Sequence, residues 1–188
     1  MRGLHWFRND LRLQDNRALS DLSRVVDEWC GLFVLEPRLV SIQSVSWKRF
    51  SFLSECLDEL ANDLEQVGNR LIIIEGPAET QIPQLMHKIS ASVLSFNEGT
   101  TPFSRSRDQS VICSLGKAGH KVLKRRDHVI FSGTDIRSSK GSAYSVYTPY
   151  RNAWWEKYSQ NDHSAVSYTH LRAHETRHDL VCRLLLEK

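Results

Sequence analysis

The sequence predicts an α/β fold in which one open sheet of five parallel strands carries helices on both faces. Short, continuous apolar runs recur between residues 2 and 123, and such runs are typical of strands buried on both faces. The segments between them carry an apolar residue at every third or fourth position, which is typical of helices that bury one side. Strand and helix alternate about five times with short connections, and this order implies a parallel sheet wound right-handedly.

The first half of the predicted fold begins with a strand over 2–7 and a helix over 16–28. Three apolar residues fall on one side of that helix: Leu19, Leu22 and Val26. A second strand is predicted over 31–37, where the apolar run ends at Glu-Pro. The most regular helix follows over 46–67, with Gly68 where a C-terminal cap belongs. Its apolar residues recur at steps of three and four: Phe50, Leu53, Leu57, Leu60, Leu64 and Val67.

The second half continues the alternation of strand and helix. The predicted segments are a strand, a helix, a strand, a helix and a strand: 70–76, 79–90, 92–96, 104–118 and 120–123. Pro83 is expected in the first turn of its helix, where a missing N–H costs least. Beyond the last strand, a loop rich in Gly, Ser, Tyr and Thr is expected over 127–150, and a short helix over 151–158. Together these elements predict a Rossmann-like (flavodoxin-like) domain.

The composition indicates a soluble globular protein, because 40% of the 188 residues are hydrophobic and 25% are charged. The net charge of +3 is compatible with an anionic partner but too small to indicate nucleic acid binding. The cysteines are widely spaced and form no CxxC pair: Cys30, Cys56, Cys113 and Cys182. They are typical of free thiols in a reducing compartment. No apolar stretch approaches membrane-spanning length, so we expect a cytoplasmic protein.

Polar residues gather where three predicted strands end. They are Arg8, Asn9, Asp10 and Arg12 after the first strand, Glu36 and Arg38 after the second, and Asn97 and Glu98 after the fourth, with Arg105 and Arg107 beyond. Ligands of open α/β sheets sit beyond the carboxyl ends of the strands, so this pattern predicts a site for a polar, planar ligand. The alternative is structural: Arg8, Asp10, Arg12 and Asp15 pair with one another and cap the next helix. No glycine-rich phosphate loop is present, which argues against ordinary nucleotide binding.

Five sequence motifs follow one another along the chain: WFRNDLRLQDNRAL (6–19), FVLEPRL (33–39), RFSFLSECLDELANDL (49–64), SRSRD (104–108) and GSAYSVYTPYRNAWW (141–155). Together they resemble the DNA photolyase/cryptochrome family. The first matches the opening signature of that family, W-x-R-x-D-L-R-x-x-D-N-x-A-L. The last matches the G-x-x-Y-x-V-[YF]-T-P-[FY]-x-x-x-W stretch at the end of its first domain. The resemblance covers residues 2–158 and stops after Gln160.

The resemblance implies a light-harvesting role for this domain. In that family the α/β domain holds an antenna chromophore, either methenyltetrahydrofolate or a deazaflavin. The antenna passes excitation to FAD in a separate helical domain, and the FAD splits a pyrimidine dimer flipped out of damaged DNA. The family activity is that of a deoxyribodipyrimidine photo-lyase, a carbon–carbon lyase. This chain lacks the helical domain, so it is expected to hold no catalytic residue and no FAD, and to be inactive alone.

Seven residues are expected to border the antenna cleft: Asn9, Asp10, Glu36, Asn97, Glu98, Arg105 and Arg107. Glu98 is the strongest single candidate, because the DASH-type cryptochrome branch places a Glu near this position against the folate. Deazaflavin-type members carry carboxylates where this chain has Gly99 and Thr101. Folate-type members often carry an Asn-Glu pair where it has Phe103 and Ser104. The identity of the antenna therefore stays open, and loss of antenna binding is an alternative.

The resemblance divides the chain into three parts. Residues 1–126 form the antenna domain, 127–160 begin an interdomain linker, and 161–188 form an unrelated tail. A misassembled reading frame is our hypothesis for the tail. It contains a match to HExxH, from His174 to His178, but lacks room for a supporting subdomain, so we expect no metal site.

The remaining expectations concern partners and alternatives. We expect a monomer that meets damaged DNA only through the missing domain and has no membrane contact. Residues 117–140 hold seven Lys or Arg against two Asp, and we interpret this basic run as a solvated face. Trp154 and Trp155 are interpreted as packing residues of the linker helix. Two alternatives remain: a fragment of a cryptochrome photoreceptor, and a free-standing module that binds a pterin or nucleotide.

Overall fold

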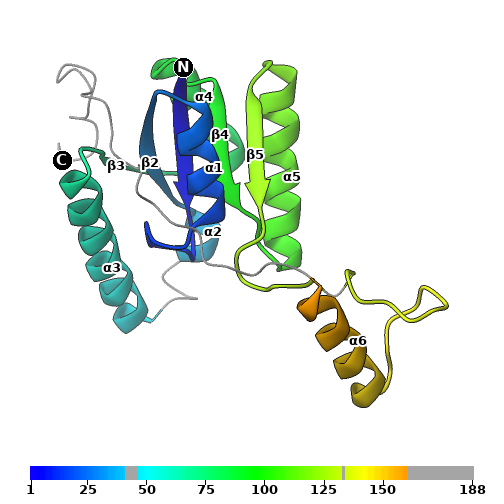
Figure 1. Ribbon diagram of the computed structural model, residues 1–188. Coiled ribbons are helices and arrows are strands. Elements are labelled where there is room, and N and C mark those ends of the chain that lie inside the picture. The colour runs from blue at the N-terminus through cyan, green and yellow to red at the C-terminus, as the bar shows by residue number, and fades with distance from the viewer. Residues whose placement is uncertain (41–45, 133, 161–188) are drawn as a thin grey trace. The chain divides into compact units, whose positions relative to one another are not determined.

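The structure, a computed structural model, describes residues 1–40, 46–132 and 134–160 (Figure 1). These residues fall into two compact units that divide after Arg125. The first unit contains a five-stranded sheet and five helices, and the second contains a loop and one further helix. The predicted HExxH segment lies outside the described residues.

The sheet has the strand order β3-β2-β1-β4-β5, and every neighbouring pair is parallel. Its strands are β1 (Arg2–Phe7), β2 (Glu28–Leu35), β3 (Leu71–Glu75), β4 (Val93–Asn97) and β5 (Lys121–Arg125). The chain builds outward from β1 to one edge and then returns to build the other. All five carboxyl ends therefore lie along one side of the sheet (Figure 1). The predicted α/β fold with an open, five-stranded parallel sheet is confirmed.

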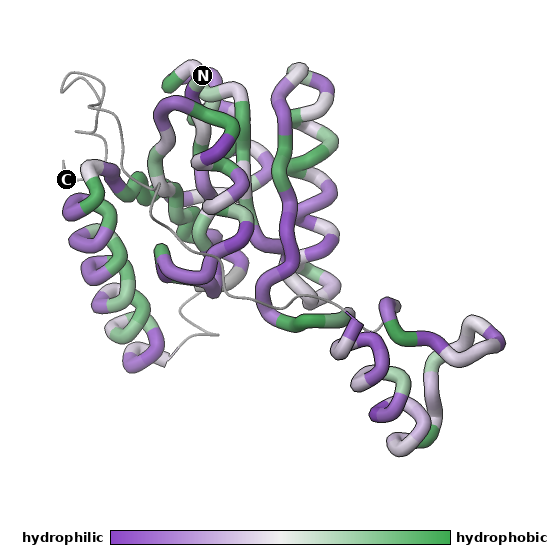
Figure 2. Tube along the Cα trace, viewed as in Figure 1, coloured by the Kyte–Doolittle hydropathy of each residue, from purple (hydrophilic) through white to green (hydrophobic). Residues whose placement is uncertain are grey.

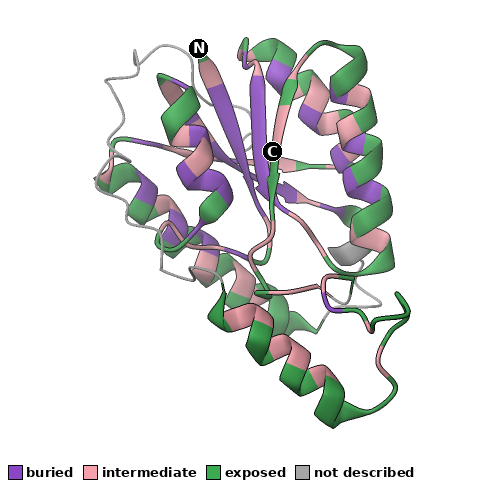
Figure 3. Cartoon of the chain, turned by 45° about the vertical axis from the view of Figure 1, so that its right-hand side comes forward, coloured by how far each residue is buried: buried purple, intermediate pink, exposed green. Residues whose placement is uncertain are grey.

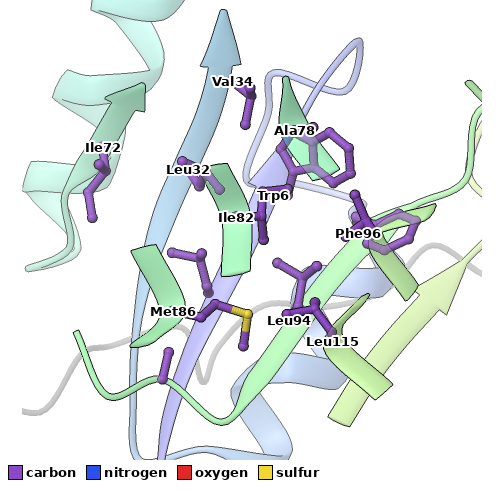
Figure 4. Packing of buried hydrophobic residues seen from close by; sticks show 13 residues of the cluster. Trp6, Leu32, Val34, Ile72, Ala78, Ile82, Met86, Leu94, Phe96 and Leu115 are labelled. Carbon is purple, nitrogen blue, oxygen red and sulfur yellow. The ribbon is translucent and has the colours of Figure 1, made fainter. Parts of the chain in front are cut away.

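Helices cover both faces of the sheet, because successive side chains of a strand point to opposite sides. One apolar cluster packs α1 (Arg17–Val25) and α3 (Trp47–Gln66) against Phe7, Trp29 and Val93. The opposite cluster packs α4 (Ala78–Lys88) and α5 (Pro102–Lys117) against seven strand residues: Leu4, Trp6, Leu32, Val34, Ile72, Leu94 and Phe96 (Figure 4). The central strands are accordingly the most buried part of the unit (Figure 3).

Several predicted boundaries are wrong, and sheet pairing explains the largest shift. Helix α1 ends at Val25, and β2 already begins at Glu28, three residues earlier than predicted. Glu28 and Trp29 pair with the first residues of β1, and Trp29 is buried. Because an extended backbone forms hydrogen bonds with β1 here, the last residues of the predicted helix belong to the strand instead. Pairing with a neighbouring strand thus outweighs the local helical periodicity.

In the first unit, two helices begin earlier than predicted, and one helix was not predicted. Helix α4 begins at Ala78, whose N–H donates to the Glu36 carboxylate, so Pro83 lies inside the helix rather than in its first turn. Helix α5 begins two residues early at Pro102, with Thr101 as its N-cap. A short helix that was not predicted, α2 (Pro37–Val40), follows β2.

Helix α3 is buried over its C-terminal half only. Its fully covered residues are Leu57, Leu60 and Leu64, whereas Trp47 is 77% and Phe52 67% exposed. The hydrophobic stripe nevertheless continues along one side of the whole helix (Figure 2). The predicted periodicity is therefore correct, but it extends beyond the part of the helix that packs on the sheet.

The second unit is organised around α6 (Tyr147–Ser159), which begins four residues earlier than predicted. Trp154 stacks on Tyr158 at 5.1 Å between ring centroids and meets Phe131 edge-on at 5.5 Å. The Lys157 ammonium donates to the Asp135 carbonyl oxygen at 2.7 Å. Trp154 is thus a packing residue of this helix, while Trp155 is 53% exposed.

Candidate functional site

The candidate site lies where the strand order reverses, between β1 and β4. These two strands pair directly, although 85 residues separate Phe7 from Val93, and the chain leaves them in opposite directions. The loops after them therefore diverge, and ligands of other open α/β sheets bind at such switch points. Polar side chains from both loops meet at this point.

A buried hydrogen-bond network joins the two loops. The Asn97 amide donates to Asp10 Oδ2 at 2.7 Å and to Asn16 Oδ1 at 2.8 Å. The Arg8 backbone N–H donates to Asp10 Oδ1 at 2.9 Å. Asn16 also caps α1, because its Oδ1 accepts from the Leu19 N–H at 3.1 Å. Asp10, Asn16 and Asn97 are all at most 2% exposed, so this network fixes the geometry of the β1–α1 turn against β4.

His5 extends the same network into the interior. Its Nδ1 lies 2.6 Å from Ser95 Oγ, and its Nε2 lies 3.3 Å from the Asn16 amide nitrogen. Burial, only partly offset by Asp10, lowers the pKa of His5 to about 4, so this imidazole is neutral at physiological pH. Burial favours the neutral form of Asp10, yet its pKa is lowered, because the carboxylate is stabilised by His5, which is protonated at acidic pH, and by hydrogen bonds from Asn97 and the Arg8 backbone.

A second set of contacts places two arginines against aromatic rings on the α5 side. Arg8 donates to Asp108 Oδ1 at 2.6 Å, and Arg107 donates to the same oxygen at 3.3 Å. The Arg8 guanidinium carbon lies 4.9 Å from the ring centroids of Trp6 and Phe96. That of Arg107 lies 4.6 Å from Trp6. Burial, followed by the neighbouring Arg8, lowers the pKa of Arg107, and Asp108 compensates part of that effect.

The third polar cluster follows β2. Arg38 donates to Glu36 Oε1 at 2.7 Å and to Glu79 Oε2 at 2.9 Å. Glu36 is 2% exposed, and its other oxygen accepts from the N–H of Ala78 at the start of α4. The Arg38 guanidinium carbon lies 5.1 Å from the ring centroid of Phe103, in the first turn of α5. Hydrogen bonds from Arg38 to Glu36 and Glu79 raise the pKa of Arg38, which therefore stays charged.

Three polar atoms of the site are buried without a hydrogen-bond partner among the described residues. They are Arg8 Nη2, Asn97 Oδ1 and Arg107 Nε. Buried polar groups almost always form hydrogen bonds in folded proteins, and leaving one without a partner costs about 1–3 kcal/mol. The edge of the sheet thus offers two donors and one acceptor to a bound molecule, which fits a polar heteroaromatic ligand.

Comparison with known proteins identifies the family. The sequence profile of the DNA photolyase family matches residues 3–169. The chain belongs to this family. A deoxyribodipyrimidine photo-lyase of Synechococcus is 34% identical over 80% of the chain, and cryptochrome-1 of Gallus gallus is 32% identical over 68%. The chain spans 31% of the length of the first of these relatives and 21% of the second.

Solved structures agree with this assignment. A photolyase of Sulfolobus tokodaii, described with two FAD molecules that imply a novel light-harvesting cofactor, is 27% identical, with a TM-score of 0.68. It matches 81% of this chain, which spans 34% of that protein. A class III photolyase of Agrobacterium tumefaciens has a TM-score of 0.72 at 24% identity, which supports the fold alone; the match covers 86% of this chain and 32% of that protein. The expected resemblance to the photolyase/cryptochrome family is confirmed.

Within this photolyase-family domain, the seven predicted cleft residues fall into two groups. Four are buried and lie in the clusters described above: Asp10, Glu36, Asn97 and Arg107. Three lie apart from them: Asn9 and Arg105 are exposed, and Glu98 pairs with Lys124 at 2.9 Å. Because β5 lies beside β4, Lys124 reaches Glu98 from the neighbouring strand. The role of these residues in ligand binding stays a prediction.

Sequence reasoning missed several residues of the site. They are His5, Asn16, Glu79, Phe103 as a packing group, and Asp108. The signal for Asp108 was present in the SRSRD motif, but its partner Arg8 lies 100 residues away. The expected pairing within the first cluster is only partly correct. The backbone of Arg8 bonds Asp10 while its guanidinium bonds Asp108, and Asn16 provides the cap.

The predicted basic run, and the question of cavities, metal sites and membrane helices, concern regions outside the candidate site. Three charges of the basic run are paired with carboxylates: Lys124 with Glu98, Arg125 with Asp21 and Arg126 with Asp135. A cavity of about 300 Å³ lies in the second unit, between Ser138 and Pro149. Among the described residues there is no cluster of three metal-binding side chains. No helix in the described ranges is long and apolar enough to cross a membrane.

Proposed function

We propose that the α/β unit is the light-harvesting domain of a deoxyribodipyrimidine photo-lyase and that an antenna chromophore binds at the carboxyl edge of its sheet. The observation that carries this proposal is the set of unpartnered buried atoms at the switch point: Arg8 Nη2, Asn97 Oδ1 and Arg107 Nε. A bound heteroaromatic ring with amide or carbonyl groups would satisfy both donors and the acceptor. When bound, such a group absorbs blue light and supplies excitation energy to a second cofactor.

The residues of the loop after β4 bear on which chromophore fits. A Cβ at Gly99 would lie 2.3 Å from the Ser104 Cβ, so no side chain fits there without movement of the loop. Thr101 is occupied as the cap of α5, where its hydroxyl accepts from the Ser104 N–H at 3.1 Å. The carboxylates expected of a deazaflavin site and the Asn-Glu pair of a folate site are thus both replaced. We infer that the bound ring is recognised mainly by arginines and aromatic rings. A flavin, as named for the Sulfolobus tokodaii protein, joins the folate and the deazaflavin as a candidate.

We propose that FAD binding and contact with damaged DNA belong to parts of a whole photolyase that this chain does not include. The support is its length, since the chain spans 31% of the Synechococcus photolyase. A cryptochrome photoreceptor would share this domain, and cryptochrome-1 of Gallus gallus matches 68% of the chain, so a cryptochrome is the alternative. We further propose a cytoplasmic monomer that does not repair DNA alone.

The proposal is tested by titrating the full 188-residue chain with methenyltetrahydrofolate, 8-hydroxy-5-deazariboflavin and FMN, each followed by its own fluorescence. Saturable binding of one chromophore at one molecule per chain is expected, together with no repair of dimer-containing DNA under blue light. Failure of all three to bind would contradict the proposal. Binding of ATP or NAD alone would instead favour a free-standing nucleotide-binding module.

A further inference from the structure

Arg38 is held in one orientation by two carboxylates from different elements. Glu36 follows β2 and is itself fixed by the N–H of Ala78, while Glu79 lies in the first turn of α4. An arginine whose Nε and Nη2 both donate to fixed carboxylates has few rotamers available, so its planar guanidinium is pre-organised. The side chain is nevertheless 45% exposed, so this plane stays accessible to a ligand.

Stability alone does not explain this arrangement. Arg38 balances the buried carboxylate of Glu36, but its second ion pair, with the more exposed Glu79, contributes little to folding, because solvent screens it and ordering the side chain costs entropy. Arg38 also belongs to neither apolar cluster. What it does contact is the ring of Phe103, which the first turn of α5 brings to 5.1 Å. Arg107 lies 5.7 Å from the same ring and 4.6 Å from Trp6.

These contacts form a continuous series along the carboxyl edge. Guanidinium groups and aromatic rings alternate in it, from the end of β2 past α5 to β4: Arg38, Phe103, Arg107, Trp6, Arg8 and Phe96. Arg8 and Arg107 are about nine-tenths buried, so these inner members present little surface to a ring. The outer pair, Arg38 and half-buried Phe103, is the more exposed part of the series and offers a surface on which an incoming planar ring can stack.

We propose that Arg38 and Phe103 are positioning residues that stack on the antenna chromophore and fix the orientation of its ring. This inference rests on the proposed function and adds to it how the ring is recognised. Energy transfer between two chromophores depends on the angle between their transition dipoles, so an antenna must be held at a fixed angle as well as bound. A planar guanidinium locked by two carboxylates provides such a surface, and a flexible lysine does not.

The test compares variants of the full chain that separate charge from planarity. Arg38→Lys keeps the charge and loses the plane, and Phe103→Leu keeps an apolar side chain and loses the ring. Arg125→Lys is the matched control, because Arg125 is also exposed and paired with a carboxylate, Asp21, but lies on β5. Dissociation constants and the fluorescence anisotropy of the bound probe are measured with methenyltetrahydrofolate, 8-hydroxy-5-deazariboflavin and FMN, at saturating protein.

For whichever probe the wild-type chain binds, Arg38→Lys and Phe103→Leu are expected to weaken binding about tenfold and to lower the anisotropy of the bound fraction. Arg125→Lys is expected to change neither. Wild-type affinity and anisotropy in Arg38→Lys and Phe103→Leu would overturn this inference and leave the proposed function standing. Absence of binding by the wild-type chain to all three probes would overturn both.

Discussion

The Asn97 amide donates a hydrogen bond of 2.7 Å to the Asp10 carboxylate, which joins the end of β4 to the turn after β1. The two residues lie 87 positions apart and are both buried. This contact closes the sheet at its switch point and holds Asp10 ionised in the interior. The polar RNDLR segment is thus first a structural feature, and it positions the arginines of the candidate site.

Replacing Asn97 tests this structural role. Asn97→Leu removes the donor to Asp10 and Asn16 and leaves a buried carboxylate short of a partner, so we expect a loss of about 1–3 kcal/mol in the free energy of unfolding. Urea denaturation at pH 7 measures it. Asn62→Leu, at an exposed position of α3, is the control and is expected to stay within about 0.5 kcal/mol of wild type. Equal effects of the two substitutions would contradict the account.

The lowered pKa of His5 leads us to expect that the stability of the protein depends on pH. Its pKa is about 4 in the folded protein and 6.5 ordinarily, so between these values the unfolded chain binds a proton that the folded protein does not. The stabilising contribution is complete above pH 6.5 and is lost as the pH falls, at about 1.4 kcal/mol per pH unit. Urea denaturation at several pH values should show that the free energy of unfolding of His5→Gln has lost this part of its dependence on pH. His128→Gln, at an exposed position, should keep it; an unchanged slope in His5→Gln would argue against a buried neutral imidazole.

Two glycines near α5 test how much space surrounds the backbone, because a Cβ would be crowded at Gly99 and free at Gly116. Gly99→Ala would place its Cβ 2.3 Å from the Ser104 Cβ, and we expect the resulting overpacking to cost about 1–3 kcal/mol. Gly116→Ala meets no atom within 4 Å and lies inside α5, so it should stabilise by about 0.5–1 kcal/mol. Thermal unfolding of the two variants checks both signs. A stable Gly99→Ala protein would show that the loop after β4 can accept a side chain.

Replacing Asp108 tests whether a buried ion pair contributes more to the free energy of unfolding than an exposed one. Asp108→Asn leaves the guanidinium groups of Arg8 and Arg107 without a counter-charge in the interior, and we expect a loss of about 3–5 kcal/mol. Asp21→Asn removes the partner of the exposed Arg125 and should cost less than about 1 kcal/mol. Chemical denaturation of both variants gives the comparison. A loss from Asp108→Asn as small as that from Asp21→Asn would contradict the role assigned to Asp108.

The fold could be predicted from the sequence because each strand is a continuous apolar run and each helix a periodic one. Boundaries failed where a partner strand competed with local periodicity, as at Glu28 and Trp29. Asp10 and Asn97 could be placed near a site by the rule that ligands bind beyond carboxyl ends. The strand order could not be predicted, and it decides that Lys124 reaches Glu98 and that Asp108 reaches Arg8.

The contact between Arg38 and Phe103 was also beyond prediction. It requires α2, which has only four residues and no periodic signal, to lie beside the first turn of α5. No local pattern places a residue of the second strand loop against one from the loop after β4. Tertiary contacts of this kind carry the recognition chemistry that we propose, and they distinguish this domain from the deazaflavin and folate patterns.

The measurement that tests the central claim most directly is amide chemical-shift mapping of the isotope-labelled full chain during titration with the chromophore that it binds. The account predicts shift changes confined to the carboxyl edge, in residues 8–10, 36–38 and 97–108, with amides of the loop from Ser138 to Pro149 unchanged. Changes centred on that loop, which lines the cavity of the second unit, would contradict the placement of the site.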